Sequence, residues 1–423
     1  MVQRRYVECP ICGKLYQIKI QLDQNIGIFE WPISFECQNC GDILEYSFSP
    51  KGFLPKDSNF QPNPTDPPIT TIGYSSSLPI TDDLYLKDLD YAGSLVWSSP
   101  YMNLTQHGWF TFEEIHHFDL FLQKMQRKLL PYKGVLKALL PILKKGNVNA
   151  FSKKLANVYG QKNYNLLRDT QEVFDTYFKL LEECYKNMIP QRYEDDYYKK
   201  YVKPLREYLE RATVNDVKQI KDKLDESGRI SIWYKDKALP YIAKMVDEIQ
   251  KLISSMIYSS VGESDVKRRG DLKVVTISFD DAVDKYEEGY EIFANGMKII
   301  VGLNNILENG DIDTFTNPQI GNLDGITGFA LLPVGKMVEH VAKNAAIIGY
   351  LDGAMNNKVR NASIHDSITY DSSTQEVLCY YNLADQSKVY GTNLMEICRL
   401  CYVQLLHVFD ATLLARIIVE KAK

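Results

Sequence analysis

The sequence predicts a mainly α-helical protein with a small β module at its N-terminus. Two observations predict this fold class. Residues 1–50 contain short alternating strands around two pairs of cysteines, and helical periodicity dominates the chain from residue 111 onward. At 423 residues the chain has room for two to four domains, each with its own core. We expect four segments, residues 1–50, 51–105, 106–270 and 271–423.

The composition is that of an ordinary soluble protein, with 45% hydrophobic and 24% charged residues. A net charge of −5 argues against a polycationic DNA-coating protein. A local basic site remains compatible with that charge, because phosphate binding depends on where charges lie rather than on their total. The sequence contains no run of about eighteen apolar residues without charge, and it begins without the apolar core of a signal peptide. We therefore expect a cytoplasmic protein that does not enter a membrane.

The N-terminal segment has the two-residue periodicity of half-buried strands. In LYQIKIQL the apolar residues Ile18, Ile20 and Leu22 alternate with polar ones. The stretches ISFECQNC and LEYSFS alternate in the same way. This pattern predicts strands with one face toward a core.

Four cysteines of this segment form two matching pairs, Cys9 with Cys12 and Cys37 with Cys40. Each pair has two intervening residues, so one tight turn can present two thiolates to the same ion. In a chain without a signal peptide, such spacing favours a metal over disulfides. Four thiolates are a ligand set typical of tetrahedral zinc.

A glycine, Gly13 or Gly41, directly follows each pair, where the chain must bend closely past sulfur. Residues 5–50 resemble the zinc-ribbon family in this arrangement. The resemblance implies a structural zinc whose closed coordination sphere does not activate water. Two interpretations of the ribbon stay open. It contacts nucleic acid or protein, or it only stabilises a module too small for a core of its own.

The next two segments differ sharply. Residues 51–105 include KDSNFQPNPTDPPITTIGYSSSLP, which is too rich in proline to hold a helix and predicts an extended connector. Residues 106–270 are predicted to be helical. One helix there carries apolar residues at steps of three and four, namely Phe112, Ile115, Phe118, Leu122 and Met125. For the tyrosine-rich tract YEDDYYKKYVKP, we prefer a helix packed partly against neighbours over a binding stripe.

The last segment is predicted to contain long helices. Ser278 is a candidate N-cap for the first of them. A strongly apolar helix is expected from residue 334 to about residue 352, and Thr392 can cap the final helix. Cys398 and Cys401 lie on the apolar surface of that final helix, which favours buried core cysteines over metal ligands. His407 lies in the same apolar helix, where a hydrogen-bonded core histidine is the expected finding.

Between these helices lies NNKVRNASIHDSITYD, residues 356–371, with Arg360, Asn361 and His365. Five helical steps rotate by about 140°, so Arg360 and His365 would not share a face of a continuous helix. Asn361 and His365, four residues apart, would share one. A substrate held by both Arg360 and His365 needs a helix end between them, or a second copy of the segment supplied by two-fold pairing. The competing interpretation is a polar turn with a surface arginine and a buried or capping histidine.

This triplet resembles the signature of the HEPN superfamily, an arginine, a polar residue that is commonly asparagine, and a histidine shortly afterwards. The match covers about residues 275–423, and an apolar helix precedes the motif while a long helix follows it. The resemblance implies a C-terminal helical bundle, a homodimer formed through that bundle, and a cleft shared by the two subunits. Residues 106–270 resemble no family that we can name.

The implied chemistry is metal-independent cleavage of RNA that leaves a 2′,3′-cyclic phosphate. The imidazole of His365 would exchange the proton of the ribose 2′-hydroxyl, and Arg360 would stabilise the anionic transition state. Asn361 would orient the imidazole or hold a phosphate oxygen. DNA lacks the attacking hydroxyl and should be spared. Catalysis would need no cofactor.

The family resemblance also implies a regulated toxin or an antiviral, abortive-infection effector, with a trigger or regulatory partner. Two rivals stay open. One is a non-catalytic HEPN-like module that binds nucleic acid or protein. The other is an adaptor whose zinc ribbon docks on other proteins.

Overall fold

The protein was analysed as a computed structural model of all 423 residues. The structure describes residues 2–21, 31–49, 52–53, 68–75, 78, 80–81, 85–86, 104–105, 108–159, 167–260, 272–316, 323–344, 346–351, 354–382, 385 and 387–423. Helices dominate, and the strands of the N-terminal segment surround the four cysteines, so the predicted fold class is confirmed.

The chain forms two compact units. Unit 1 consists of residues 1–126, 249–286 and 358–399, and unit 2 consists of residues 127–248, 287–357 and 400–423. These units do not coincide with the predicted segments 106–270 and 271–423, because each segment contributes residues to both units. Contacts in space define the units, and long helices carry the chain from one unit to the other.

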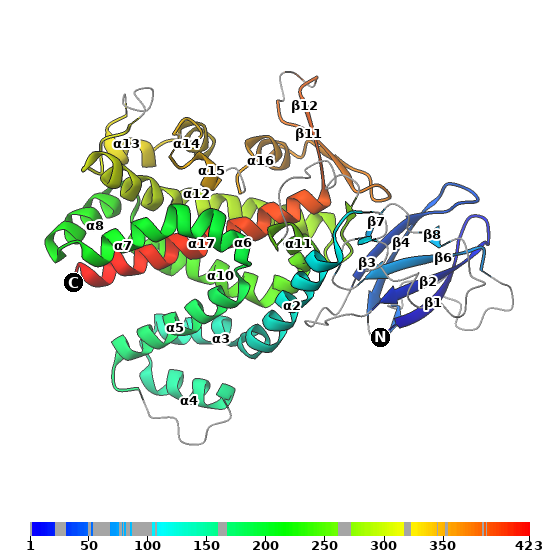
Figure 1. The fold of residues 1–423 in the computed structure, drawn as a ribbon, viewed down its shortest axis with the longest axis horizontal. Helices are drawn as coiled ribbons and strands as arrows, with labels where there is room; N and C mark the ends of the chain where they lie inside the picture. Colours follow the sequence, from blue (N-terminus) through cyan, green and yellow to red (C-terminus); the bar gives the residue numbers. More distant parts are fainter. Residues whose placement is uncertain are drawn as a thin grey trace. The chain divides into compact units, whose positions relative to one another are not determined.

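The N-terminal part of unit 1 holds two small sheets, whose strands appear in blue in Figure 1. The first has the order β1-β2-β6-β8 and the second the order β3-β4-β5. Their bounds are β1 Val2–Glu8, β2 Leu15–Gln21, β3 Trp31–Glu36, β4 Ile43–Ser49, β5 Gly52–Phe53, β6 Thr70–Ser75 and β8 Tyr85–Leu86. Buried and partly exposed residues alternate along β2 and β3, as predicted for half-buried strands.

One strand comes from the stretch predicted as an extended connector. β6 (Thr70–Ser75) pairs in parallel with β2, and its Ile72 and Tyr74 are buried in the same core as Ile18. Apolar side chains at alternate positions give this short stretch a face that the N-terminal core can bury. Most of the remaining connector lies outside the described residues.

The rest of unit 1 contains a third small sheet, a two-stranded sheet of β7 and β9, and a short helix. The third sheet has the order β10-β11-β12, and α16 (Asn357–Ile364) leads into it. The bounds in this part are α11 Met256–Ser260, β7 Ile80–Thr81, β9 Leu272–Lys273, β10 Ile368–Tyr370, β11 Glu376–Tyr380 and β12 Val389–Asn393. β10 and β11 pair antiparallel and are joined by a short turn that includes Ser372 and Ser373, so they form a hairpin.

Unit 2 is built from helices. They are α3 Val135–Lys144, α4 Val148–Tyr159, α5 Thr170–Met188, α6 Gln191–Tyr193, α7 Lys203–Arg211, α8 Val214–Gly228, α9 Ile230–Trp233, α10 Leu239–Glu248, α13 Gly325–Ala330, α14 Val334–Val341 and α15 Ile348–Leu351. The tyrosine-rich tract forms a π-helical stretch, Glu194–Val202, that continues into α7. Tyr193 at its start is buried and stacks on Tyr197. This agrees with a helix packed against its neighbours.

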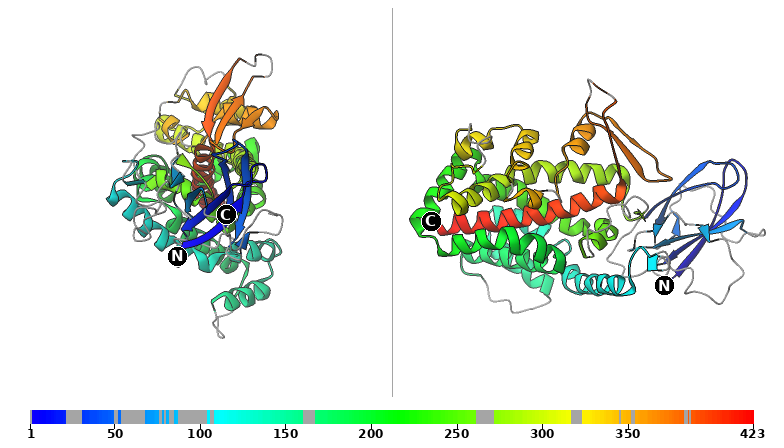
Figure 2. Two further views of the ribbon diagram at one scale, coloured as in Figure 1. Left: turned by 90° about the vertical axis from the view of Figure 1, so that its right-hand side faces the viewer. Right: turned by 45° about the horizontal axis from the view of Figure 1, so that its top comes forward.

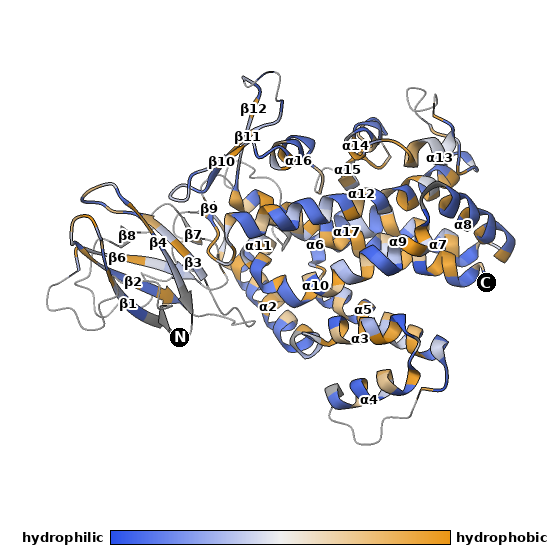
Figure 3. Ribbon diagram, turned by 180° about the vertical axis from the view of Figure 1, so that it is seen from behind, coloured by the Kyte–Doolittle hydropathy of each residue, from blue (hydrophilic) through white to orange (hydrophobic). Residues whose placement is uncertain are grey.

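Three long helices contain residues of both units, namely α2 (Phe112–Leu129), α12 (Phe279–Asn309) and α17 (Leu394–Lys421), and the short helix α16 has its first residue, Asn357, in unit 2. Four members of the stripe predicted for α2, which Figure 3 colours by hydropathy, are buried (Ile115, Phe118, Leu122 and Met125), whereas the prediction was wrong for Phe112, which is exposed at the start of the helix. Ser278 caps α12 as predicted, because its hydroxyl accepts a hydrogen bond from the backbone N–H of Asp281.

Helix α17 runs without interruption in Figure 2. Among the described helices it is the one long and apolar enough to cross a membrane, with a mean hydropathy of 1.5. The protein itself buries 89% of that apolar stretch, which is the pattern of a core helix.

The predicted N-cap of α17 was wrong by one residue. Asn393 rather than Thr392 caps it, since the Asn393 Oδ1 atom accepts the backbone N–H of Glu396 at 2.8 Å.

The predicted helix over residues 334–352 is interrupted. α14 ends at Val341 and α15 begins at Ile348. Between them, the side chain of Asn344 accepts the backbone N–H of Ala346 at 3.0 Å. A short polar side chain that bonds to the nearby backbone competes with helical hydrogen bonds, which explains the break at this residue.

Helix α12 packs against Trp233 at a glycine. A β-carbon added to Gly296 would lie 2.6 Å from the Cη2 atom of Trp233, whose indole N–H is held by the carbonyl oxygen of Ile292. We expect Gly296→Ala to lower the free energy of unfolding. Overlap with a rigid ring costs about 3 kcal/mol, which exceeds the gain of about 1 kcal/mol from removing a helical glycine.

Gly335→Ala is the matched control, because no atom lies within 4 Å of the added carbon. Thermal unfolding of the two variants beside the parent measures the difference. Equal melting temperatures for Gly296→Ala and Gly335→Ala would mean that the Trp233 ring moves aside freely.

Candidate functional site

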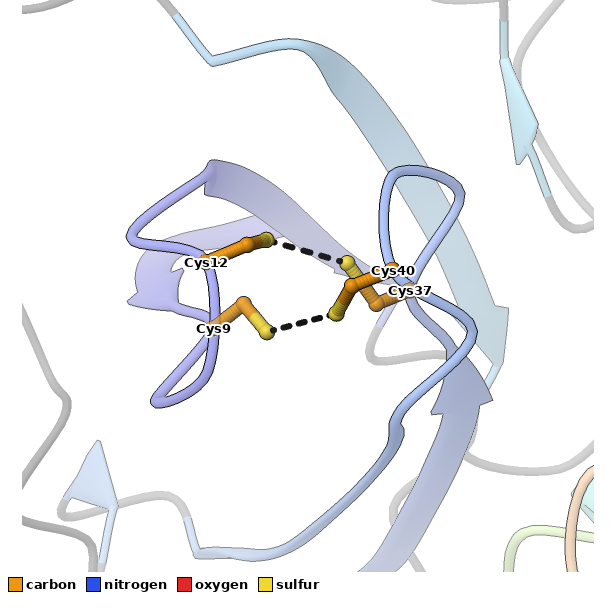
Figure 4. Close-up of side chains that lie close together, drawn as sticks. All are labelled: Cys9, Cys12, Cys37 and Cys40. Carbon is orange, nitrogen blue, oxygen red and sulfur yellow. Dashed lines mark hydrogen bonds between the residues drawn. The ribbon is translucent and has the colours of Figure 1, made fainter.

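The four N-terminal cysteines come together at one end of the two sheets. The turn between β1 and β2 carries Cys9 and Cys12, and the turn between β3 and β4 carries Cys37 and Cys40 (Figure 4). The Sγ atoms of Cys9 and Cys40 are 3.6 Å apart, as are those of Cys12 and Cys37. All four sulfur atoms lie within 4.8 Å of one another. The structure therefore gathers the predicted ligands into one cluster.

The two turns have the same backbone geometry. Gly13 donates its N–H to the carbonyl oxygen of Cys9 at 2.9 Å, and Gly41 donates to the carbonyl oxygen of Cys37 at 2.8 Å. Both glycines are left-handed, with φ angles of 67° and 76°. A side chain at either position would strain the backbone, which explains why glycine follows each pair.

A tyrosine from β2 supports the cluster. The hydroxyl group of Tyr16 lies 3.1 Å from the Sγ atom of Cys37 and accepts the backbone N–H of Gln38 at 2.9 Å. A Cys37 thiolate has no proton, so in that state the Tyr16 hydroxyl is the donor to the sulfur. Burial opposes ionisation of Cys37, but the Tyr16 hydroxyl and the N–H groups of Cys40 and Asn39 prevail and lower the pKa of Cys37 to about 6.

Two other sulfur atoms, those of Cys9 and Cys40, resist ionisation. Burial raises the pKa of Cys9. The backbone of Asp42 lowers the pKa of Cys40, but desolvation and the three neighbouring sulfur atoms outweigh it and raise that pKa to about 12. Four thiolates this close repel one another, so the cluster needs a cation before all of them can ionise.

The spacing fits a four-coordinate metal ion. A tetrahedral ion bound at about 2.3 Å to each sulfur holds its sulfur atoms about 3.8 Å apart. The two separations of 3.6 Å are close to that value. Four sulfur ligands would leave a tetrahedral ion no open position for substrate or water. Within the described residues this is the one group of three or more cysteine, histidine or acidic side chains arranged to hold an ion.

The other predicted site lies on α16 (Asn357–Ile364) and the turn that follows. Val359, Ala362 and Ser363 are buried, whereas Asn361 is half-buried and His365 is exposed. Asn361 therefore lies on the partly exposed side of α16, and His365 is exposed just beyond its end.

Arg360 is half-buried on the same helix, and its Nη1 atom donates to the Oδ1 atom of Asn361 at 3.4 Å. The helix ends at Ile364, one residue before His365. Asp366 then adopts a left-handed conformation with a φ of 48°, and Ser367 donates its backbone N–H to the carbonyl oxygen of Ala362 at 2.9 Å. A helix end thus separates Arg360 from His365. This is one of the two arrangements in which a single substrate could contact both side chains.

The first residue of α16 is anchored within unit 2. The side-chain amide of Asn357 donates to the carbonyl oxygen of Gly335 at 3.1 Å, and its oxygen accepts the hydroxyl group of Tyr290. These bonds fix where the helix begins, three residues before Arg360.

Unit 2 contains a buried polar cluster that the sequence did not predict. The carboxylate of Asp410 on α17 accepts hydrogen bonds from the hydroxyl groups of Tyr185, Tyr193 and Tyr350, the last two at 2.8 and 2.9 Å. The Nδ1 atom of His407 lies 2.5 Å from the hydroxyl group of Tyr193. All five side chains are buried. His407 is therefore a hydrogen-bonded core histidine, as expected.

The protons of this cluster can be counted. The Nε2 atom of His407 lies 2.6 Å from the carbonyl oxygen of Tyr350, so it must donate. The single hydroxyl proton of Tyr193 cannot serve both His407 and Asp410, so one further proton lies on either the imidazole or the carboxyl group. In both cases the cluster has no net charge, which suits a buried site. Burial lowers the pKa of His407.

A sequence signal for this cluster exists. His407 and Asp410 lie three residues apart in an otherwise apolar helix, so they share one buried face. The tyrosines that complete the cluster come from α5, α6 and α15, and nothing in their spacing relates them to α17.

No protein-family model, no curated protein and no solved structure matches this chain.

Proposed function

We propose that the chain is a metal-independent endoribonuclease of the HEPN type, in which Arg360, Asn361 and His365 cleave RNA. The observation that carries this proposal is the exposure of His365 at the end of α16, one helical turn beyond Asn361. A general base must reach its substrate, and an exposed imidazole beside a half-buried amide and guanidinium meets that condition.

The reaction begins at the ribose 2′-hydroxyl. The imidazole of His365 removes its proton, and the oxygen attacks the adjacent phosphorus while the bond from phosphorus to the 5′-oxygen breaks. The 5′-oxygen takes a proton from the imidazolium so formed or from water, which leaves a 2′,3′-cyclic phosphate and a 5′-hydroxyl. Arg360 stabilises the added negative charge on the phosphate oxygens. Asn361, which already contacts Arg360, holds a phosphate oxygen or orients the imidazole.

Two copies of α16 complete this site in the proposal. Arg360 lies within α16 and His365 lies beyond its end, so the two groups of one copy do not share a helix face. A homodimer formed through the C-terminal helices would bring the arginine of one subunit toward the histidine of the other. A nuclease of this kind must be restrained in its host. A regulated toxin or antiviral defence effector of the cytoplasm, released by a trigger or partner, is the role that fits.

The ion at the four cysteines is zinc in this proposal. Zinc prefers four thiolates at tetrahedral positions, and Cys9, Cys12, Cys37 and Cys40 supply them. Its role is to hold the ribbon together.

A cleavage assay tests the nuclease. Purified parent, Arg360→Ala and His365→Ala proteins are incubated with structured RNA in EDTA, and the products are examined for cyclic phosphate. We expect the parent to cleave and each variant to lose at least about 100-fold in rate, since a general base contributes that much or more. His116→Ala, an exposed histidine on α2, is the matched control and should cleave like the parent.

Host growth during expression of the same proteins detects a nuclease that is dormant when purified. Binding of RNA without cleavage by all four proteins, together with normal growth, would instead support a non-catalytic binding module. Cleavage by His365→Ala at the parent's rate would contradict the assigned role.

A further inference from the structure

The eight cysteines of the chain differ in how easily solvent reaches them. Cys40 is exposed and Cys12 is half-buried. The other six are buried, namely Cys9, Cys37, Cys184, Cys379, Cys398 and Cys401. The susceptibility of a cysteine to oxidation follows its exposure and its thiolate character. By exposure alone, an oxidant dissolved in water reaches Cys40 before any other cysteine.

A bound ion supplies the thiolate character as well. A metal ion binds cysteine only in its deprotonated form, and the four sulfur atoms of the cluster lie within 4.8 Å of one another, close enough to share one ion. With the ion in place, Cys40 is therefore an exposed thiolate, and the thiolate is the form of cysteine that reacts as a nucleophile. Elsewhere in the chain burial has the opposite effect, since it raises the pKa values of Cys184 and Cys379 and keeps both as thiols.

A second sulfur atom lies beside Cys40. The Sγ atom of Cys9 is 3.6 Å from that of Cys40 and belongs to the other turn (Figure 4). A disulfide bond is about 2.05 Å long, so the two atoms need to approach each other by only about 1.5 Å once no ion holds them apart. Cys9 is thus placed to react with an oxidised Cys40.

We propose that Cys40 is a site of reversible oxidation by hydroperoxides, that Cys9 is its resolving cysteine, and that this oxidation expels the bound ion. The Cys40 thiolate attacks one oxygen of hydrogen peroxide, and the O–O bond breaks to give a sulfenic acid and a hydroxide ion. The Cys9 thiolate then attacks the sulfur of Cys40, which forms the disulfide and releases a second hydroxide ion. The two cysteines lose two electrons, the peroxide gains them, and water or buffer protonates the hydroxide ions.

Loss of the ion follows from the ligand count. After the first disulfide only Cys12 and Cys37 remain as thiolates, and a structural zinc site needs four ligands. The Sγ atoms of Cys12 and Cys37 are also 3.6 Å apart, so a second equivalent of peroxide joins them in the same way. This inference concerns the metal centre, and it does not rest on the proposed nuclease activity.

The disulfide links the same two turns as the ion does. Cys9 lies between β1 and β2, and Cys40 lies between β3 and β4. A covalent bond between them keeps the two hairpins joined after the ion has left. Oxidation should therefore be reversible, because a thiol reductant regenerates both thiolates while the turns are still close together.

Peroxide treatment of the zinc-loaded full-length protein tests the proposal. A chromogenic zinc chelator follows release of the ion, and mass spectrometry of alkylated samples maps the disulfides over time. We expect the ion to appear as the Cys9–Cys40 disulfide forms, and dithiothreitol with added zinc to restore the bound ion. Cys40→His keeps four ligands, since three cysteines and one histidine also hold structural zinc, but it has no sulfur at the exposed position. It should release the ion at least about tenfold more slowly than the parent.

Cys184→Ser is the matched control, because it removes a buried cysteine of unit 2 and should release the ion like the parent. If Cys40→His does not bind zinc, the time course of disulfides in the parent decides by itself. A parent that retains its ion under peroxide, a first disulfide other than Cys9–Cys40, or release that no reductant reverses would overturn the proposal. Release by Cys40→His at the parent's rate would overturn it as well. Zinc content and disulfide maps do not depend on RNA cleavage, so failure here leaves the nuclease proposal unaffected.

Discussion

Replacement of Cys37 by serine is expected to remove the metal ion and to unfold the N-terminal sheets. The buried core there is small and lies directly behind the cluster, because Cys9 and Cys37 are themselves part of it. Binding of a structural zinc contributes about 10–16 kcal/mol in small metal-dependent modules, which is more than such a core supplies. Loss of one sulfur leaves three thiolates, and it also breaks the contact with Tyr16.

Two measurements check this result. Elemental analysis should find one ion per chain in the parent and almost none in the variant. Hydrogen exchange should rise throughout β1 to β4 and remain low in α5 and α10. Cys184→Ser is the matched control, since Cys184 is equally buried but lies in unit 2. A purified parent without bound metal, or a Cys37→Ser protein with full metal content, would show that the four cysteines are not a metal centre.

The second large effect is expected at Asp410. Asp410→Ala removes the acceptor shared by three buried tyrosine hydroxyl groups. These groups are buried, so the hydroxyl groups of Tyr185 and Tyr350 lose the bond to Asp410 without access to water, whereas that of Tyr193 still has His407 as a partner. Breaking a buried network of this kind costs about 3–5 kcal/mol. Asp410→Asn retains the shape and one oxygen acceptor, so it should lose less.

Hydrogen exchange of α17 measures this change locally, beside thermal unfolding of the whole chain. Thr412→Val on the same helix is the matched control, because the Thr412 hydroxyl is buried but bonds only to the Val408 carbonyl oxygen at 2.6 Å. It should lose about 1 kcal/mol at most. If Asp410→Ala is no less stable than Thr412→Val, water enters the cluster and satisfies the tyrosines.

The clustering of the N-terminal cysteines could be predicted from the sequence because it depends on residues that are close together in the chain. A pair of cysteines separated by two residues is a single turn, and the glycine after it is required by that turn's positive φ. Periodicity of two predicted the strands around them, and periodicity near 3.6 predicted the helices. Each of these signals depends on residues close together in the chain.

Other features depended on residues far apart in the chain. Thr70–Ser75 is a strand because β2 offers it an edge and the core accepts Ile72, and its proline-rich surroundings gave no sign of that partner. Which sulfur atom of one turn contacts which of the other, Cys9 with Cys40 and Cys12 with Cys37, follows from how the two hairpins meet.

The sequence by itself determined the mainly helical class, the four ligands at Cys9, Cys12, Cys37 and Cys40, and the position of the Arg360–His365 segment. Only the tertiary structure decided that Asp410 gathers Tyr185, Tyr193 and Tyr350 around it. The spacing of nearby residues predicts a turn or a helix face. A buried polar cluster forms where helices pack together, and the order of those helices in the chain does not predict which of them come into contact.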